Sequence, residues 1–322
     1  MHPSRKTGYP LWSPMQQSKD ALLAQGLPAE DPAHAPASLL RFPDGGEYRI
    51  EIPSTEGPKA LTAVLDEARM RDVPVHRVSQ GSGIMLLTNS ELREMLAIGR
   101  QARVEVNLFL GPRAGWDIGA QSVSPTGKAF ALAARGANQL VQSLEDVRRG
   151  VDAGLRSILV SDIGTLDVIS NMRAKGQLPA NLIIKTSVMM APANPASARL
   201  IEQHGADTIN IPSDLTLPQI ASIRAAITKP IDFYVEAPDT IGGFIRHYEV
   251  ADLIRVAAPI YLKFGLRNSP DVYPSGTHLD STVLLLCRER VRRAQLACEM
   301  IARYASEAVM SPLGAADLGV PA

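Results

Sequence analysis

Short apolar runs alternate with longer amphipathic segments from residue 47 to the end of the chain. The short runs predict strands over residues 48–52, 75–78, 104–110, 157–160, 182–186, 208–211, 231–235 and 260–264. The segments that follow them predict helices over residues 57–71, 89–100, 138–153, 166–175, 195–204, 217–226, 244–255 and 281–304. Eight strand–helix units call for a parallel sheet, and closing that sheet gives an α/β fold, the (β/α)8 TIM barrel.

A doubly wound open sheet is the alternative architecture. Such a sheet usually carries a glycine fingerprint after its first strand. Residues 53–57 read Pro-Ser-Thr-Glu-Gly and do not match it. The closed barrel is therefore the leading prediction.

The first 45 residues differ from the rest of the chain. This stretch has prolines at positions 3, 10, 14, 28, 32, 36 and 43. We therefore predict a proline-rich N-terminal arm over residues 1–45 and a barrel domain over residues 46–322. The arm either packs on the barrel or on a second subunit, which would make a homo-oligomer, or it is a partly disordered tail.

Charge and cysteine usage narrow the class of protein. Lys plus Arg and Asp plus Glu number 33 each, so no basic excess indicates a nucleic-acid partner or an anionic membrane surface. No apolar run reaches the roughly 18 residues of a membrane span, and no signal-peptide core follows Met1. Cys287 and Cys298 would lie roughly 16 Å apart on one helix, too far for a disulfide. We expect a cytoplasmic protein that binds a small molecule.

Most predicted strands carry a polar residue at every second position. The apolar phase should face the helices, so the polar phase should face the lumen. The expected luminal residues are Arg49, Glu51, Glu105, Asn107, Lys185, Thr208, Asn210, Asp232, Tyr234, Glu236, Tyr261 and Lys263. On strand two, either His76 or Arg77 could face the lumen. On strand four, either Ser161 or Asp162 could do so.

Position along the strand separates two sets of luminal residues. Arg49, Glu105 and Asp232 come early in their strands and could pair as a structural network. The later residues lie toward the C-terminal rim, where barrel enzymes place their sites. These are Glu51, Asn107, Lys185, Asn210, Glu236 and Lys263. Burying so many charges without a function would be costly, so we predict a site there.

Three chemistries suit these residues. A buried lysine, Lys263 or Lys185, could form a Schiff base with a carbonyl substrate. Alternatively, Glu51 and Glu236 could hold a divalent metal with Asp162 or His76, although no metal-binding motif is present. Third, a glutamate could act as general base beside a lysine that stabilises an oxyanion. The leading assignment makes Lys263 the electrophilic or Schiff-base group and Glu236 the general acid/base, with Lys185 and Glu51 also catalytic.

The loops of the rim supply candidates for substrate binding. Gly243 and Arg267 follow strands seven and eight, the usual phosphate site of this fold, and could bind an anion. Asn107 and Asn210 would contact the substrate from inside the barrel. Arg113 lies in the long connection 111–127, a candidate lid, and His278 lies in the loop before the last helix.

Residues 262–267, Leu-Lys-Phe-Gly-Leu-Arg, with Ser269 and Tyr273 after them, resemble a motif of the peptidase U32 family. The Gly-Ala-Asp-Thr-Ile stretch at 205–209 is also similar to its strand entry. The resemblance implies a barrel with an inward Lys263. Gly265 stands where the family has Glu. The family's cysteine-rich segment is absent, so we expect no iron–sulfur cluster.

The leading functional prediction is a small-molecule enzyme, a lyase or a hydrolase, acting on a polar, anionic substrate. A U32-like peptidase or other hydrolase is the first alternative. A non-catalytic barrel that binds a partner protein is the second. The cofactor remains open, with a divalent metal as the one candidate.

Overall fold

The computed structural model describes residues 15–117, 119–125, 127 and 131–322 and contains eight strands. They are β1 (Tyr48–Pro53), β2 (Arg77–Gln80), β3 (Glu105–Phe109), β4 (Ser157–Val160), β5 (Ile183–Thr186), β6 (Ile209–Asn210), β7 (Ile231–Glu236) and β8 (Ile260–Phe264). Their order is β5-β4-β3-β2-β1-β8-β7-β6, and every neighbouring pair is parallel. A parallel bridge between Lys185 and Thr208 joins the two ends. The predicted (β/α)8 TIM barrel is confirmed.

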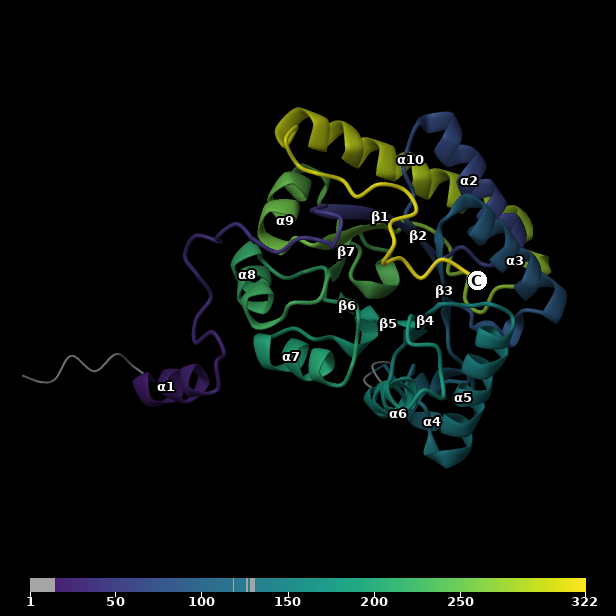
Figure 1. The fold of residues 1–322 in the computed structure, drawn as a ribbon, viewed down its shortest axis with the longest axis horizontal. Coiled ribbons are helices and arrows are strands. Elements are labelled where there is room, and N and C mark those ends of the chain that lie inside the picture. The colour runs from purple at the N-terminus through teal and green to yellow at the C-terminus, as the bar shows by residue number, and fades with distance from the viewer. Residues whose placement is uncertain (1–14, 118, 126, 128–130) are drawn as a thin grey trace, which may run out of the picture.

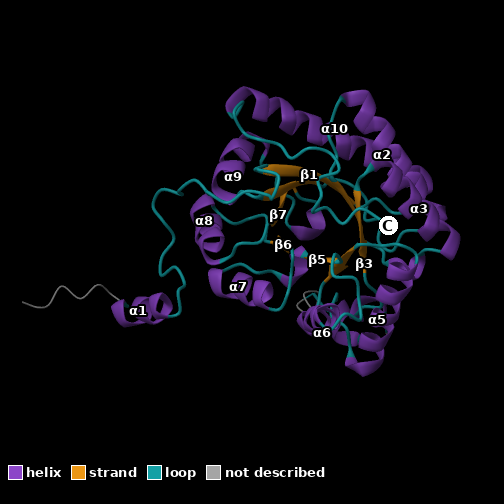
Figure 2. Cartoon of the chain, in the orientation of Figure 1, coloured by secondary structure: helices purple, strands orange, loops and turns teal. Residues whose placement is uncertain are grey.

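The helices, with the exception of α1, surround the barrel (Figures 1 and 2). The helices are α1 (Gln16–Ala24), α2 (Pro58–Arg71), α3 (Asn89–Ala102), α4 (Ala120–Val123), α5 (Gly136–Asp152), α6 (Ile163–Ala174), α7 (Pro195–Gln203), α8 (Leu217–Ala226), α9 (Val250–Ala257) and α10 (Asp280–Tyr304). The helix predicted over 244–255 was wrong in its first half. Backbone hydrogen bonds tie Phe244 and Arg246 to β7 and its end, so regular helix begins only at Val250.

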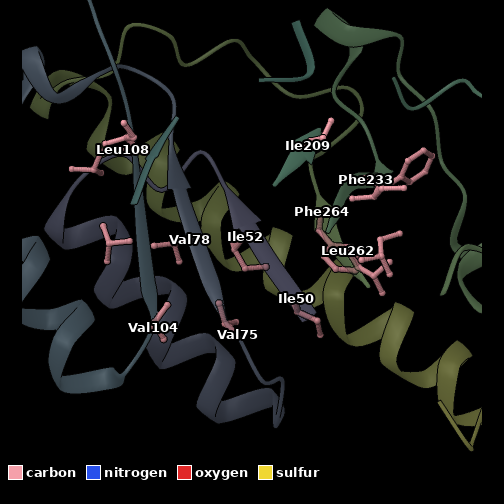
Figure 3. Close-up of a cluster of buried hydrophobic side chains, with 14 of the residues drawn as sticks. Ile50, Ile52, Val75, Val78, Val104, Leu108, Ile209, Phe233, Leu262 and Phe264 are labelled. Carbon is pink, nitrogen blue, oxygen red and sulfur yellow. The ribbon is translucent and has the colours of Figure 1, made fainter. Parts of the chain in front are cut away.

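The apolar phase of the strands packs against the helices. Figure 3 shows this layer, in which Ile50, Val78, Leu108 and Leu262 project from four different strands. Each of these side chains is fully buried. Burying one such side chain contributes about 1.5–3 kcal/mol, so the outer layer supplies most of the driving force and leaves the lumen free for polar groups.

After α10, residues 305–322, for which the sequence pattern predicts no helix or strand, pack against the N-terminal end of the barrel. Asp317 forms an ion pair with the buried Arg49 at 2.6 Å. The backbone N–H of Gly319 donates to a carboxylate oxygen of Glu105 at 3.2 Å. Two of the three residues predicted to be structural, Arg49 and Glu105, therefore anchor this tail at the N-terminal end of the strands.

His76 is enclosed at the same end of the barrel. Its Nδ1 accepts a hydrogen bond from the Ile50 N–H at 3.1 Å, so its Nε2 carries the proton and donates to the Ser311 carbonyl at 2.8 Å. Burial lowers the pKa of His76 from 6.5 to about 4. Between these pH values the unfolded chain binds a proton that the folded protein does not.

Acidification should therefore destabilise the protein through His76. We expect the free energy of unfolding to fall by roughly 3 kcal/mol more between pH 6.5 and 4 than in a His76→Gln variant. Urea unfolding at both pH values measures this difference. Equal slopes for wild type and His76→Gln would contradict the expectation.

Candidate functional site in the barrel lumen

Six charged side chains meet inside the barrel. Three are cations and three are carboxylates, and none is more than 2% exposed. They are Arg77, Lys185, Lys263, Glu51, Glu105 and Asp232. Strand register explains the meeting, because Glu51 of β1 lies beside Arg77 of β2 and Lys263 of β8. The charges balance, which is the condition for keeping them ionised away from water.

Glu51 lies at the centre of this cluster. Its carboxylate accepts hydrogen bonds from Arg77 Nε at 2.8 Å and Ser79 Oγ at 2.6 Å. Both of its oxygens contact Lys185 Nζ, and Lys263 Nζ lies 3.6 Å away. Burial alone would raise the pKa of Glu51, but the charges of Arg77, Lys185 and Lys263 outweigh it and hold that pKa well below its ordinary value.

Arg77 connects Glu51 to the other two carboxylates. Its guanidinium forms an ion pair with Asp232 and lies 3.6 Å from Glu105. Its Cζ stacks 3.5 Å from the centre of the Tyr261 ring. Of the two residues of strand two that could face the lumen, His76 and Arg77, it is Arg77 that does so. The predicted structural role of Asp232 also gains support, because that carboxylate is fully engaged by Arg77 and by the Thr208 hydroxyl at 2.8 Å.

The two lysines differ in their protonation. Burial, with the nearby charges of Arg77 and Lys263, lowers the pKa of Lys185 to about 7 against the opposing pull of Asp232 and Glu51. Burial also acts on Lys263, but Glu51 and the other acidic neighbours outweigh it and raise its pKa. Near neutral pH, Lys185 can therefore be a neutral amine beside a charged Lys263, which is the arrangement that a nucleophilic lysine requires.

Two amides extend the cluster. In the orientation that satisfies its neighbours, Asn210 accepts a hydrogen bond from Lys263 Nζ at 2.7 Å. Lys263 Nζ also lies 4.1 Å from the centre of the Tyr234 ring. Asn107 donates to Ser157 Oγ at 2.8 Å, while its own Oδ1 is buried and has no hydrogen-bond partner among the described residues. That oxygen is an acceptor available to a donor group of a ligand.

Glu236 does not join the lumen. A register shift between Tyr234 and Glu236 interrupts the alternation, and Glu236 pairs with Phe264, a residue of the outer apolar layer. Its carboxylate accepts from the Arg267 N–H at 3.0 Å and contacts His247 Nε2 at 3.3 Å. Burial alone would raise the pKa of Glu236, but these hydrogen bonds and the charge of Arg293 lower it.

The predicted pairing of Lys263 with Glu236 is therefore not seen. Lys263 contacts Glu51, Asn210 and Tyr234. Glu236 instead contacts the loop after β8, His247 and Arg293 of α10. One bulge at the end of β7 accounts for the error, because an extra residue turns the following side chain to the other face.

The predicted anion site after β7 is also altered. Gly243 has a φ of +67°, and its N–H donates to the Pro238 carbonyl at the end of a tight turn. No helix starts there, so its N–H is not presented to a ligand. Arg267 lies beside this turn with its side chain 51% exposed and paired to Asp239 at 3.1 Å. Of the two residues, only Arg267 keeps a group that an anion could reach.

Arg113 and His278 occupy different surroundings. Arg113 is buried between the rings of Phe109 and Trp116, each 3.9 Å from its Cζ, and donates to the Gly81 carbonyl at 2.9 Å. It thereby fastens the loop after β3 to the loop after β2. His278 is exposed in a 3-10 turn, Thr277–Leu279, before α10. Their predicted contact with substrate stays a prediction.

The loop after β8 crosses to the ends of β1 and β2. Tyr273 and Ser54 place their hydroxyl oxygens 2.5 Å apart, and the Ser275 N–H donates to Ser82 Oγ at 2.8 Å. A Cβ on Gly81 would lie 2.3 Å from the Tyr273 ring, so glycine is needed where this ring rests. These contacts fasten one side of the C-terminal rim.

The residues considered for a metal lie apart. Asp162 caps α6 by accepting from the Thr165 N–H at 2.8 Å, and Ser161 donates to the Leu132 carbonyl. His76 uses both ring nitrogens at the other end of the barrel. Within residues 15–117, 119–125, 127 and 131–322, no three His, Cys, Asp or Glu side chains form a group that could hold a metal ion. The side chains proposed to bind a metal, Glu51 and Glu236 with Asp162 or His76, are therefore not brought together.

Comparison with known families gives one match. The model of peptidase family U32 matches residues 131–237, about one third of the chain. This supports a distant relationship to that family and confirms the predicted resemblance at that level. The matched region includes the Gly-Ala-Asp stretch at 205–207 but ends before Lys263 and Arg267. A search of curated proteins finds no match.

Several solved structures share the fold. The U32 peptidase Mk0906 is 14% identical over 72% of this chain and 97% of that one, with a TM-score of 0.42. A Rubisco-like protein from Rhodopseudomonas palustris is 13% identical over 80% and 64% of the two chains, with a TM-score of 0.47. 2,3-Dimethylmalate lyase is 10% identical over 67% of this chain and 76% of that one, with a TM-score of 0.44. Such low similarity carries no information on the reaction, and the barrel assignment rests on the strand pairing itself.

Among the helices of the described residues, none combines the length and the apolar character needed to cross a membrane.

Proposed function

We propose that this chain is a barrel enzyme of the lyase type that acts on a carbonyl compound through a Schiff base on Lys185. One observation carries the proposal: Lys185 contacts Glu51 in a closed lumen, and burial, with the charges of Arg77 and Lys263, lowers its pKa to about 7. A lysine becomes nucleophilic at neutral pH when it is desolvated beside another cation.

The neighbours of Lys185 fit the steps of such a reaction. The neutral amine adds to the carbonyl carbon, and one of its two protons moves to the oxygen. A second proton, taken up from solvent, lets that oxygen leave as water, so the nitrogen keeps its other proton and an iminium forms. Glu51 touches Nζ and is placed to carry a proton between these atoms. Lys263 would stabilise negative charge on the substrate oxygen. Bond cleavage next to the iminium carbon then leaves its electron pair on the imine nitrogen.

Two groups would orient the substrate. Asn107 Oδ1, which is buried and has no partner in the described part of the chain, would accept a hydrogen bond from a substrate hydroxyl. The six luminal charges balance, so the barrel interior itself has no excess cation for an anionic group. Recognition of an anionic end would therefore depend on the half-exposed Arg267 at the rim.

Reductive trapping tests this function. We expect cyanoborohydride with pyruvate, glyoxylate or short aldehydes to add the mass of one reduced adduct, and peptide mapping to place it on Lys185. A Lys185→Arg variant should lose the adduct, while Lys229→Arg, at a half-exposed lysine, should keep it. Labelling spread over surface lysines with none on Lys185 would contradict the proposal.

A hydrolase is the second candidate, and the match to peptidase family U32 over residues 131–237 is the observation that favours it. Turnover of a fluorogenic peptide library, abolished by Glu51→Gln but not by Lys185→Arg, would favour a hydrolase over the lyase. Absence of both trapping and turnover would favour the non-catalytic barrel.

A further inference from the structure

Helix α1 exposes an apolar face that the described residues of its own chain leave uncovered. None of its residues is buried. Met15, Leu22 and Leu23 are 74%, 38% and 58% exposed. Lys19 precedes the two leucines by three and four positions, so these residues share one face of the helix. A nine-residue helix is below the roughly 12–15 residues that are marginal in isolation, so it needs a surface to pack on.

The arm that carries α1 is fixed to the barrel. Leu27 is buried, Ser222 Oγ donates to Asp31 at 2.7 Å, and Arg255 donates to the Ala35 carbonyl at 2.7 Å. The arm therefore follows α8 and α9. Figure 1 shows that α1 lies beyond this anchored stretch, apart from the ring of helices. The anchored arm therefore places α1 away from its own barrel, where it is accessible to a neighbouring molecule.

A groove on the same chain has the complementary character. It has a volume of about 650 Å³ and lies between the arm, α9 and the end of α10. Ala251, Ile254 and Ala308 contribute apolar surface. Tyr248, Tyr304 and Val309 line it while remaining 79%, 53% and 51% exposed. Exposed apolar residues gathered around one hollow mark an interaction site more often than bare surface.

The apolar face of α1 and the groove also carry opposite charges, Lys19 on the helix and Glu307 in the groove. Glu307 lines the groove and forms no ion pair with any residue that the structure describes. Lys19 lies on the apolar face of α1, and its pairing with Glu30 at 2.8 Å is exposed, a type of contact that contributes little. A helix docked by its leucines would bring a cation toward a carboxylate that lacks one.

We propose that α1 is an exchanged arm, which packs its Lys19, Leu22 and Leu23 face into the Tyr248–Tyr304 groove of a second copy of this chain. Reciprocal exchange makes a closed dimer, because each copy contributes one helix and one groove. The partner is the protein itself, since the apolar face of α1 and the groove, both left open by the residues that the structure describes, belong to one sequence.

Light scattering during gel filtration of the full chain tests the proposal. We expect twice the mass of one chain, and a dissociation constant raised by about 100-fold or more in a Leu22→Asp/Leu23→Asp variant and in Tyr248→Asp. All three positions are exposed in the single chain, so circular dichroism and melting of the monomeric variants should show an intact barrel. Leu200→Asp, at an exposed position of α7, is the matched control and should stay dimeric.

Charge reversal locates the contact. Lys19→Glu should weaken the dimer, and adding Glu307→Lys should restore it. A wild type that remains monomeric at all concentrations would overturn the proposal, as would a dimer that the α1 variants leave intact. Dissociation by the α1 variants without any effect of Tyr248→Asp, and without rescue by Glu307→Lys, would overturn the assignment of the groove.

Discussion

Replacing Arg77 by Met should lower the free energy of unfolding by about 3–5 kcal/mol, because it leaves buried carboxylates without their cation. Arg77 is fully buried and forms ion pairs with Glu51 and Asp232. An arginine cannot escape burial by losing its proton, since its pKa stays above about 12. Burial lowers the pKa of Arg77, but Asp232, Glu51 and Glu105 outweigh it and raise that pKa further.

Urea unfolding of wild type and variant at pH 7 measures this loss. Arg69→Met is the matched control, because Arg69 forms an ion pair with Asp66 while its side chain is 77% exposed. Such a pair contributes about 0–1 kcal/mol. If Arg77→Met were no less stable than Arg69→Met, the luminal cluster would not be an ionic network of the kind described.

Strand periodicity predicted the barrel and most of its interior because two requirements coincide. Residues such as Ile50 and Leu262 must face the helices, and this leaves their neighbours Glu51 and Lys263 to face the lumen. Glu51, Lys185, Asn107 and Asn210 were located correctly for this reason. A period of two residues predicts only which face of the sheet a side chain occupies.

The errors came where a local irregularity breaks the period. The bulge after Tyr234 removed Glu236 from the predicted site, and no glycine or proline at that position signals it. In strand two, His76 and Arg77 are both polar, so alternation alone could not choose between them. The side chain of Glu105 lies beside Arg77 in register, and pairing opposite charges across neighbouring strands would have resolved the choice.

Long-range contacts were beyond the reach of the pattern. The tail 305–322 closes the barrel through Asp317 and Gly319, two residues without a hydrophobic period. The fastening of Tyr273 to Ser54 joins positions more than two hundred residues apart. Only a folded chain brings these groups together, so their roles could be read from the structure alone.

Glu51→Gln should have the second large effect, and its size should depend on pH. The substitution leaves Arg77, Lys185 and Lys263 facing only Asp232 and Glu105, an excess of one positive charge in a closed lumen. Below neutral pH we expect a loss of about 3–5 kcal/mol in the free energy of unfolding. Unlike Arg77, Lys185 can release its proton, since its pKa in the intact cluster is already about 7.

The release of the Lys185 proton determines how the free energy of unfolding depends on pH. In the wild type the folded protein holds fewer protons at Lys185 than the unfolded chain between about pH 7 and 10.5, so stability rises with pH in this window. Without Glu51 the pKa of Lys185 falls further, and the rise should begin below pH 7. The variant should therefore gain up to about 1.4 kcal/mol per pH unit between pH 6 and 7, relative to wild type.

Urea unfolding at intervals of half a pH unit, from about pH 5.5 to 8.5, resolves this slope by difference. The double variant Glu51→Gln/Lys185→Met removes one carboxylate and one amine, so the luminal charges balance again and the added slope should disappear. A slope that persists in the double variant would assign the titration to another group. A Glu51→Gln variant with the wild-type slope would show that Lys185 keeps its proton without its carboxylate, which would also remove the basis for a nucleophilic Lys185.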